Sequence, residues 1–196
     1  MILKATALGI MGTFYICYFS KMLSQKKKCI RTDQLGKGKE GFLKFIEIAL
    51  KITTYLLPLV QVISILIYPE DSCHPLRIAA VTTEMVGVVV FALSVAQMKD
   101  NWRAGVQRED KTNLVTSGIY SVSRNPAFLG FDLMYIGILF AFFNRWLLFA
   151  TLFAVCLFHL QIVNVEEDFL FEAFGEEYLE YKGKVCRYFG RKFRRK

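Results

Sequence analysis

The residues of this chain with the greatest chemical capacity gather in two stretches. One is a polar, glycine-containing loop within residues 102–132, and the other is the acidic pair Glu166 and Glu167. At Pro126 the loop passes directly into an apolar helical pattern, and proline suits the first turn of a helix because the amide proton it lacks would be unpaired there. The loop is therefore predicted to lie at the mouth of a membrane helix, where a polar cofactor can be held against an apolar acceptor.

Composition assigns these stretches to a membrane protein. The chain has 196 residues, of which 54% are apolar and 15% aromatic, and this is too apolar for a soluble domain of that length. The expected fold class is all-α integral membrane with a carboxy-terminal helical hairpin, because only Asn144 and Arg145 separate the last two apolar runs. Five runs are predicted to cross a hydrocarbon core of about 30 Å, at residues 2–19, 45–68, 76–98, 127–143 and 146–164.

Lysine and arginine gather on one side of these predicted helices. Residues 20–44 carry eight of them, the segment after the second run carries none, and eight more follow Glu166. Because basic residues accumulate on the cytoplasmic side of a membrane, we expect the amino terminus outside and the long loop and tail in the cytoplasm. Attraction to anionic lipid head groups explains these basic flanks and the net charge of +8. No nucleic-acid partner is therefore expected.

The sequence offers no support for metal chemistry or for a nucleotide-binding fold. Its five cysteines are scattered without paired spacing, and the only two histidines are His74 and His159. It contains no dinucleotide-binding fingerprint, phosphate-binding loop or nucleophile elbow. We expect no metal site and no Rossmann-type cofactor domain.

Ionisable residues near the apolar runs are functional candidates, because burying a charge in lipid is costly. Glu47 and Lys51 are four residues apart and are expected to pair on one helix face. His159 and Glu166 are seven residues apart, which on an α-helix puts them on one face, about 10 Å apart along the axis and toward one cavity. Folding of the hairpin brings Asp132 within about a turn of His159. Such a pair would be either catalytic or a polar link between two helices.

The region after the fifth run has an amphipathic pattern. Phe169, Leu170 and Phe174 form an apolar stripe, Gly175 interrupts it, and Tyr178 continues with helical spacing. This predicts amphipathic cytoplasmic helices that begin at the acidic pair.

Two sequence blocks and the hairpin between them resemble a known family. The order "LVTSGIYSVSRNPAFLG" at residues 114–130, an apolar hairpin, and "EEDFLFEAFGEEYLEYKGKVCRYF" at residues 166–189 resembles the integral-membrane isoprenylcysteine carboxyl methyltransferases, and phospholipid methyltransferases share a looser version. The resemblance covers residues 100–190. It implies two parts: residues 1–98, three helices with a basic loop, and residues 99–196, a methyltransferase-like catalytic region.

The resemblance implies that S-adenosylmethionine binds on the cytoplasmic side and that a lipophilic acceptor enters from the bilayer. Carried over position by position, it implies cofactor contacts for Gln107, Leu114, Val115, Tyr120, Asn125, Pro126, Ala127, Phe128 and Glu166. An ionised acceptor carboxylate would need no base. An amine or thiol acceptor would, and His159 and Glu167 are the candidates for that base.

One departure from the family pattern bears on the acceptor. Relatives that act on prenylcysteine carboxylates carry an arginine four residues before the position of Glu166, and this chain has Ile162 there. Asn125 and Phe128 likewise stand where histidine and tyrosine are usual. Arg124 is then the candidate cation that would orient an acceptor carboxylate in place of the missing arginine.

The sequence thus predicts an S-adenosylmethionine-dependent methyltransferase for a lipophilic acceptor, with the isoprenylcysteine carboxylate as the best single candidate. The alternatives are a methyltransferase for a lipid amine or small thiol, an NADPH-dependent sterol-type reductase, and a non-enzymatic membrane scaffold. The small size favours a prokaryotic cytoplasmic membrane over the endoplasmic reticulum. Membrane lipids are the other expected partners, and nothing in the sequence indicates an oligomeric state.

Overall fold

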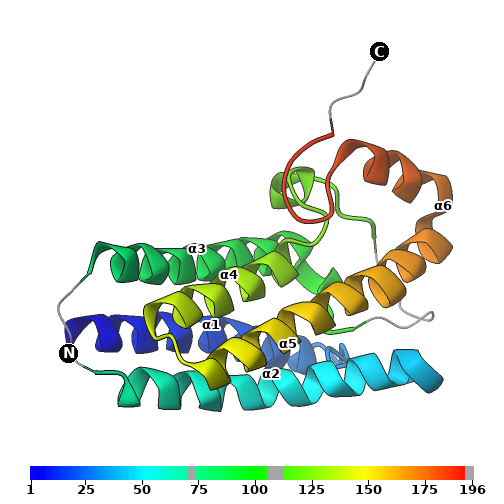
Figure 1. Cartoon of the computed structure of the whole chain (residues 1–196). Helices are drawn as coiled ribbons and strands as arrows, with labels where there is room; N and C mark the ends of the chain where they lie inside the picture. The colour runs from blue at the N-terminus through cyan, green and yellow to red at the C-terminus, as the bar shows by residue number, and fades with distance from the viewer. Residues whose placement is uncertain (70–73, 106–112, 193–196) are drawn as a thin grey trace.

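The computed structural model of the protein describes residues 1–69, 74–105 and 113–192, and these parts of the chain are helical throughout their regular structure (Figure 1). A π-helical turn at Ile162–Glu166 joins the last two helices, and short 3-10 turns lie at Lys99–Asn101 and Gly118–Ser121. The α-helices are α1 (Ile2–Lys27), α2 (Gly41–Ile67), α3 (Pro75–Met98), α4 (Pro126–Ala141), α5 (Arg145–Gln161) and α6 (Glu167–Lys184).

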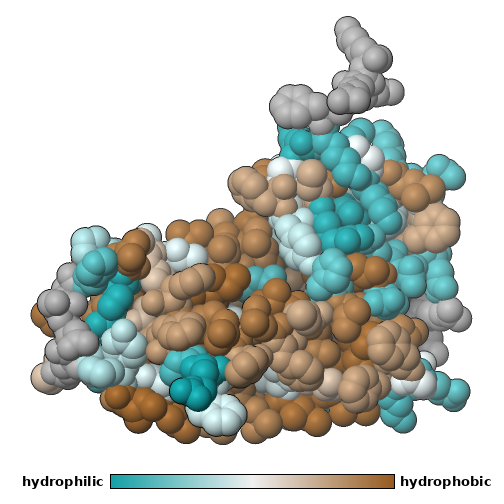
Figure 2. All heavy atoms as spheres, in the orientation of Figure 1, coloured by the Kyte–Doolittle hydropathy of each residue, from teal (hydrophilic) through white to brown (hydrophobic). Residues whose placement is uncertain are grey.

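The helices confirm the prediction of an all-α integral membrane protein. Within the described residues, four helical units are long and apolar enough to cross a membrane: α1, α2, α3 with its following turn, and the continuous unit Arg145–Lys184. α4, at the place of the predicted run 127–143, is a shorter apolar helix of 16 residues. The apolar part of the last unit is α5, whereas α6 is polar (Figure 2). We therefore take α5 as its membrane-spanning part, with Glu166 and Glu167 outside it.

Helices α1 to α5 lie side by side, and α6 turns away from them together with the loop before α4 and the carboxy-terminal segment (Figure 1). The predicted hairpin of α4 and α5 forms, with Phe142–Asn144 as its turn. Its two helices nevertheless pack mainly on other neighbours, α4 on α3 and α5 on α2. The loop that carries the sequence motif thus leaves from the tightly packed pair α3 and α4.

Three glycines allow α3 and α4 to approach closely. A Cβ atom at Gly87 of α3 would lie 2.5 Å from the backbone nitrogen of Met134. A Cβ atom at Gly137 of α4 would lie 2.5 Å from the backbone nitrogen of Glu84, and one at Gly130 would meet Phe91 at 2.8 Å. Small residues at helix contacts are the usual means of close packing in membranes, where apolar side chains gain little from leaving lipid. This contact fixes both ends of the motif loop.

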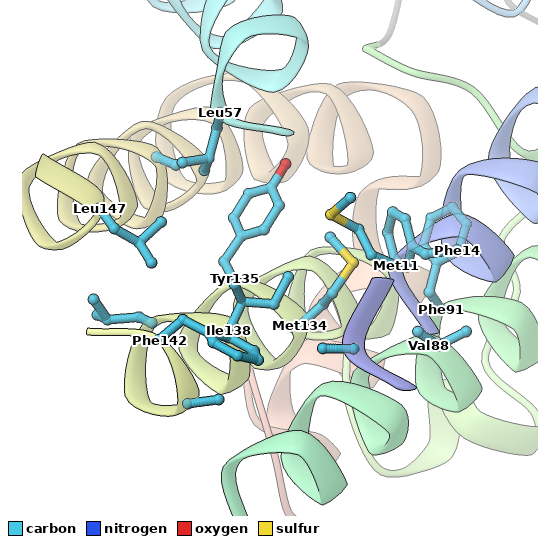
Figure 3. Close-up of a cluster of buried hydrophobic side chains, with 14 of the residues drawn as sticks. Met11, Phe14, Leu57, Val88, Phe91, Met134, Tyr135, Ile138, Phe142 and Leu147 are labelled. Atoms are coloured by element: carbon cyan, nitrogen blue, oxygen red, sulfur yellow. The ribbon is translucent and has the colours of Figure 1, made fainter. Parts of the chain in front are cut away.

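The core is built around α4. Met134, Tyr135 and Ile138 of α4 are fully buried, and they lie between side chains of the other helices, such as Phe14 and Leu147 (Figure 3). Aromatic rings extend this core toward the motif loop. Phe91 packs against Phe131 with the ring centroids 5.2 Å apart, and against Trp102 with the ring centroids 6.2 Å apart.

The segment between α1 and α2 folds back onto the start of the motif loop. The backbone nitrogen of Gln34 donates to the carbonyl of Ala104 at 2.8 Å, and the nitrogen of Ala104 donates to the carbonyl of Thr32 at 3.0 Å. The side chain of Gln25, at the end of α1, donates to the carbonyl of Trp102 at 2.8 Å. The amino-terminal part of the chain therefore helps to form the region that contains the motif.

This fold-back corrects one prediction from the sequence. Glu47 and Lys51 were expected to pair with each other along α2, but Glu47 pairs with Lys39 and Lys51 pairs with Asp33. The reason is tertiary: the segment brings its own charges onto the first turns of α2, where they meet the helix side chains more closely than these meet each other.

Candidate active site

A cavity with both apolar and charged side chains in its wall, here called the polar cavity, lies between the motif loop, the start of α4 and the junction of α5 with α6. Its volume is about 110 Å³. Seven of the nine residues expected to contact a cofactor line it: Leu114, Val115, Tyr120, Asn125, Ala127, Phe128 and Glu166. Pro126 is the first residue of α4, as expected, and does not line the cavity. Gln107 lies outside the described residues.

A larger, apolar cavity of about 260 Å³ lies among α1, α2, α4 and α5. Its walls are mainly aromatic and aliphatic side chains, such as Tyr18, Leu50 and Phe158. The apolar and polar cavities share four lining residues: Trp102, Arg103, Ala127 and Phe128. The two cavities therefore meet at the amino-terminal end of α4, so that a molecule in one lies next to a molecule in the other.

The motif loop is held in place by α6 and the segment after it. The hydroxyl of Tyr181 donates to the carbonyl of Tyr120 at 2.6 Å. The backbone nitrogen of Arg124 donates to the carbonyl of Cys186 at 3.1 Å, and the side-chain amide of Asn125 donates to the carbonyl of Arg187 at 3.2 Å. The conformation of the loop thus depends on the second sequence block, which explains why the two blocks occur together.

Glu166 faces the polar cavity without a cationic partner among the described residues. Its carboxylate accepts a hydrogen bond from Nε2 of Gln161 at 3.3 Å. Burial raises the pKa of Glu166 to about 7, and the Gln161 hydrogen bond and the charge of Lys39 only partly oppose this rise. A carboxylate whose charge is disfavoured in this way favours a cationic ligand, because the ligand would supply further positive charge.

Glu167, the next residue, faces a cluster of cations and lines neither cavity. It accepts from Nη2 of Arg124 at 3.0 Å, from Nζ of Lys182 at 2.9 Å and from Nε of Arg187 at 2.7 Å. Burial disfavours its charge, but the hydrogen bonds from Arg187 and Lys182 and the charge of Arg124 outweigh burial and lower its pKa to about 2.

Arg124 contacts Glu167 and Tyr178 on this side of the junction, and its buried Nε has no hydrogen-bond partner among the described residues. Besides Glu167 it donates to the hydroxyl of Tyr178 at 2.6 Å, and its side chain is only 4% exposed. It also lines the polar cavity, but its charge is compensated there by Glu167. Arg103, by contrast, lines both cavities, and its Nη1 donates to the carbonyls of Asp100 and Trp102 at 2.5 and 2.9 Å.

His159 lies away from both cavities. It is exposed, and its Nδ1 lies 2.6 Å from the hydroxyl of Tyr188. The prediction that His159 and Glu166 face one cavity is therefore wrong. The reason is the π-helical turn Ile162–Glu166, whose wider hydrogen-bond spacing rotates Glu166 away from the face of His159. Asp132 is buried on α4, and the partner that His159 takes is Tyr188 rather than Asp132.

The sequence reasoning did not identify Gln161 and Arg103 as members of the site. Gln161 is fully buried at the end of α5, lines the apolar cavity and contacts the carboxylates of both Glu47 and Glu166. A polar residue at the end of an apolar run and close to the acidic pair was the available signal. Within residues 1–69, 74–105 and 113–192 no group of three His, Cys, Asp or Glu side chains could hold a metal ion.

The sequence of this chain is similar to those of known methyltransferases. Residues 76–177 match the sequence model of the phospholipid methyltransferase family. Protein-S-isoprenylcysteine O-methyltransferase of Saccharomyces cerevisiae is 39% identical over 79 residues, which are 40% of this chain and 33% of the yeast protein. The Xenopus laevis protein of the same name is 33% identical over 122 residues, 61% of this chain and 42% of the relative. The B form from Arabidopsis thaliana is 31% identical over 80 residues, 41% of each chain. The chain thus matches less than half the length of these relatives.

Proposed function

Because the chain belongs to the phospholipid methyltransferase family, we propose that it transfers a methyl group from S-adenosylmethionine to a lipophilic acceptor held in the membrane. The acceptor that fits best is the carboxylate of a C-terminal isoprenylcysteine, because the similar yeast and Xenopus proteins are named protein-S-isoprenylcysteine O-methyltransferases. The site would open toward the cytoplasm, on the basic side of the helices.

The observation that carries the proposal is the meeting of the two cavities. The polar cavity has the residues of the family motif in its wall, and the apolar cavity lies among membrane helices. A methyl transfer between a polar donor and a lipid-soluble acceptor needs two such compartments in contact, because the reacting atoms must be held close together and away from water.

The residues of the polar cavity suit the chemical groups of S-adenosylmethionine. Glu166 would pair with the ammonium group of the cofactor, and the rings of Tyr120 and Phe128 would face its positive charge. Leu114 and Val115 would pack against the adenosyl group. The cofactor would supply a methyl group on a positively charged sulfur. The acceptor oxygen bonds to the methyl carbon in line as the carbon–sulfur bond breaks, and the sulfur leaves as a neutral thioether.

The chain's own contribution is mainly positioning. An ionised carboxylate acceptor needs no general base, but it needs a cation to orient it once water has been removed. Arg103 occupies the junction of the two cavities and would supply that cation. Arg124 is the weaker choice, because it lines only the polar cavity and not the apolar one.

A carboxylate acceptor is also favoured over an amine or thiol. Those acceptors would have to lose a proton, and neither candidate base lines a cavity: His159 is exposed, and Glu167 is bound by three cations. Neither side chain is therefore positioned in this structure to take a proton from an acceptor in the apolar cavity.

Calorimetric binding of S-adenosylmethionine and of NADPH to the detergent-purified protein, with a Glu166→Gln variant, tests the cofactor. We expect binding of S-adenosylmethionine alone, about 10-fold or more weaker in the variant because a charged hydrogen bond is lost. Binding of NADPH alone would establish the reductase alternative. Binding of neither by folded protein would favour the scaffold. Transfer of labelled methyl groups to N-acetyl-S-farnesylcysteine then tests the acceptor.

A further inference from the structure

Gln161 has the contacts of a residue that recognises a ligand. It is 0% exposed, it lines the apolar cavity, and its Nε2 donates to Oε1 of Glu47 at 3.0 Å and to Oε1 of Glu166 at 3.3 Å. Its carbonyl oxygen, Oε1, is buried and has no hydrogen-bond partner among the described residues. Most buried polar atoms in proteins are hydrogen-bonded, so such an atom beside a cavity indicates a missing donor.

The orientation of the Gln161 amide is fixed by its neighbours. Glu47 is fully buried and is held by the backbone nitrogen of Gly36 at 2.6 Å and by the ammonium group of Lys39. Its carboxylate can only accept hydrogen bonds, so the amide must turn its NH₂ group toward it. Both protons of that group are then used by Glu47 and Glu166. The carbonyl oxygen is left as an acceptor for something else.

We propose that the carbonyl oxygen of Gln161 recognises the head group of the acceptor by accepting a hydrogen bond from an N–H beside the methylated carboxylate. The substrate class is then an apolar chain that carries both a carboxylate and an amide or amine N–H, as a prenylated cysteine does and a simple lipophilic acid does not. Glu47 is a positioning residue, since it holds the amide in this orientation without touching the acceptor. The inference rests on the proposed function.

Two acceptors that differ in one group test the inference. N-acetyl-S-farnesylcysteine has the amide N–H, and S-farnesyl-3-thiopropionic acid has hydrogen in place of the acetamido group. Methyl transfer is measured with both, and binding is followed separately by the fluorescence of Trp102, which lines both cavities, in a Trp146→Phe background. For the wild-type chain we expect a KM and a dissociation constant about 10-fold lower or more for the acceptor with the N–H, with little change in kcat.

The decisive variant is Gln161→Met, which keeps the volume and removes the hydrogen bond. We expect the preference between the two acceptors to fall to about one, because the bond that distinguishes them is gone. Glu47→Gln is expected to give an intermediate preference, since the Gln161 amide can then turn over. The matched control is Gln61→Met: Gln61 is also fully buried with an unpartnered amide, but it lines neither cavity. It should keep the wild-type preference.

Three outcomes would overturn the inference in different ways. If wild-type protein binds and methylates both acceptors equally well, head-group recognition is absent while the proposed function stands. If Gln161→Met keeps the wild-type preference, another residue recognises the N–H. If S-adenosylmethionine binds but neither acceptor does, the proposed acceptor class falls, and the role of Gln161 falls with it.

Discussion

Glu166 and Glu167 are adjacent in the chain, yet they lie on opposite sides of the α5–α6 junction and their pKa values shift in opposite directions. On one side Glu167 is surrounded by Arg124, Lys182 and Arg187, and its pKa is lowered to about 2. On the other side Glu166 has only the amide of Gln161 as a hydrogen-bond partner, and burial raises its pKa to about 7.

The difference separates Glu167, a carboxylate that stabilises the fold, from Glu166, for which we propose a role in cofactor binding. Charge that is already compensated stabilises the fold and gains nothing from a ligand, whereas a buried carboxylate without a cation gains most when a positive ligand arrives. The π-helical turn makes the difference possible, because it lets two neighbouring residues face a cavity and a cluster that an unbroken helix would orient differently.

The largest effect should follow from removing the charge of Glu167. Glu167→Gln leaves Arg124 buried without its counter-charge and should lower the free energy of unfolding by about 3 kcal/mol, since breaking a buried ion pair is costly. Thermal unfolding in detergent measures this loss. Glu166→Gln is the matched control, with an unfolding temperature at or above that of the wild type. Equal destabilisation by both variants would remove the distinction between the two carboxylates.

The two arginines near the cavities offer the next test. Arg124→Met should cost about 2 kcal/mol of stability, because it breaks the contacts to Glu167 and Tyr178. It should leave the KM for the acceptor near the wild-type value. Arg103→Met should instead raise the KM for the acceptor about 10-fold, through loss of a charged hydrogen bond. The reverse pattern in steady-state kinetics would return the acceptor-binding role to Arg124.

The sequence was sufficient for the parts of this site that depend on local pattern. Apolar run lengths predicted the membrane helices, proline preference predicted the start of α4 at Pro126, and the motif predicted residues that line one cavity together. These features follow from composition and from neighbouring residues, which a single sequence contains.

The parts that failed depend on tertiary structure. Spacing along an ideal helix put His159 beside Glu166, and a π-helical turn with no clear sequence signal separated them. Spacing also paired Glu47 with Lys51, and a fold-back segment gave each another partner. Gln161 becomes informative only once Glu47, 114 residues away in the chain, is known to contact it.

As the pH falls from neutral, Glu166 should be protonated before Glu167, and binding of S-adenosylmethionine should weaken. A raised pKa means that Glu166 becomes protonated below about pH 7, and the protonated form cannot pair with the ammonium group of S-adenosylmethionine. The dissociation constant should therefore rise about 20-fold between pH 7.5 and pH 5.5 for a single group of this pKa. In Glu166→Gln it should stay nearly constant over that range, which calorimetry would show.

The contribution of Glu167 to stability should not change between pH 7.5 and pH 5.5. Its pKa is lowered from 4.5 to about 2, so its contribution to stability is present above pH 4.5 and is lost as the pH falls toward 2. Unfolding temperatures that fell between pH 7.5 and pH 5.5 in wild type, but not in Glu167→Gln, would contradict this assignment.

The smallest effect on stability and on the rate of methyl transfer is expected for a substitution of His159. This residue also tests which kind of acceptor the site uses. His159→Phe keeps a ring stacked on Tyr188 and removes one exposed hydrogen bond, so stability should change by about 0.5 kcal/mol or less. The rate of methyl transfer should change less than about twofold, because a carboxylate acceptor needs no base and His159 lines neither cavity. A pH–rate profile measured at saturating cofactor checks this. A changed profile together with a large fall in kcat would mean that His159 removes a proton from the acceptor. The acceptor would then be an amine or a thiol, and the site would have to reorganise around the exposed face of α5.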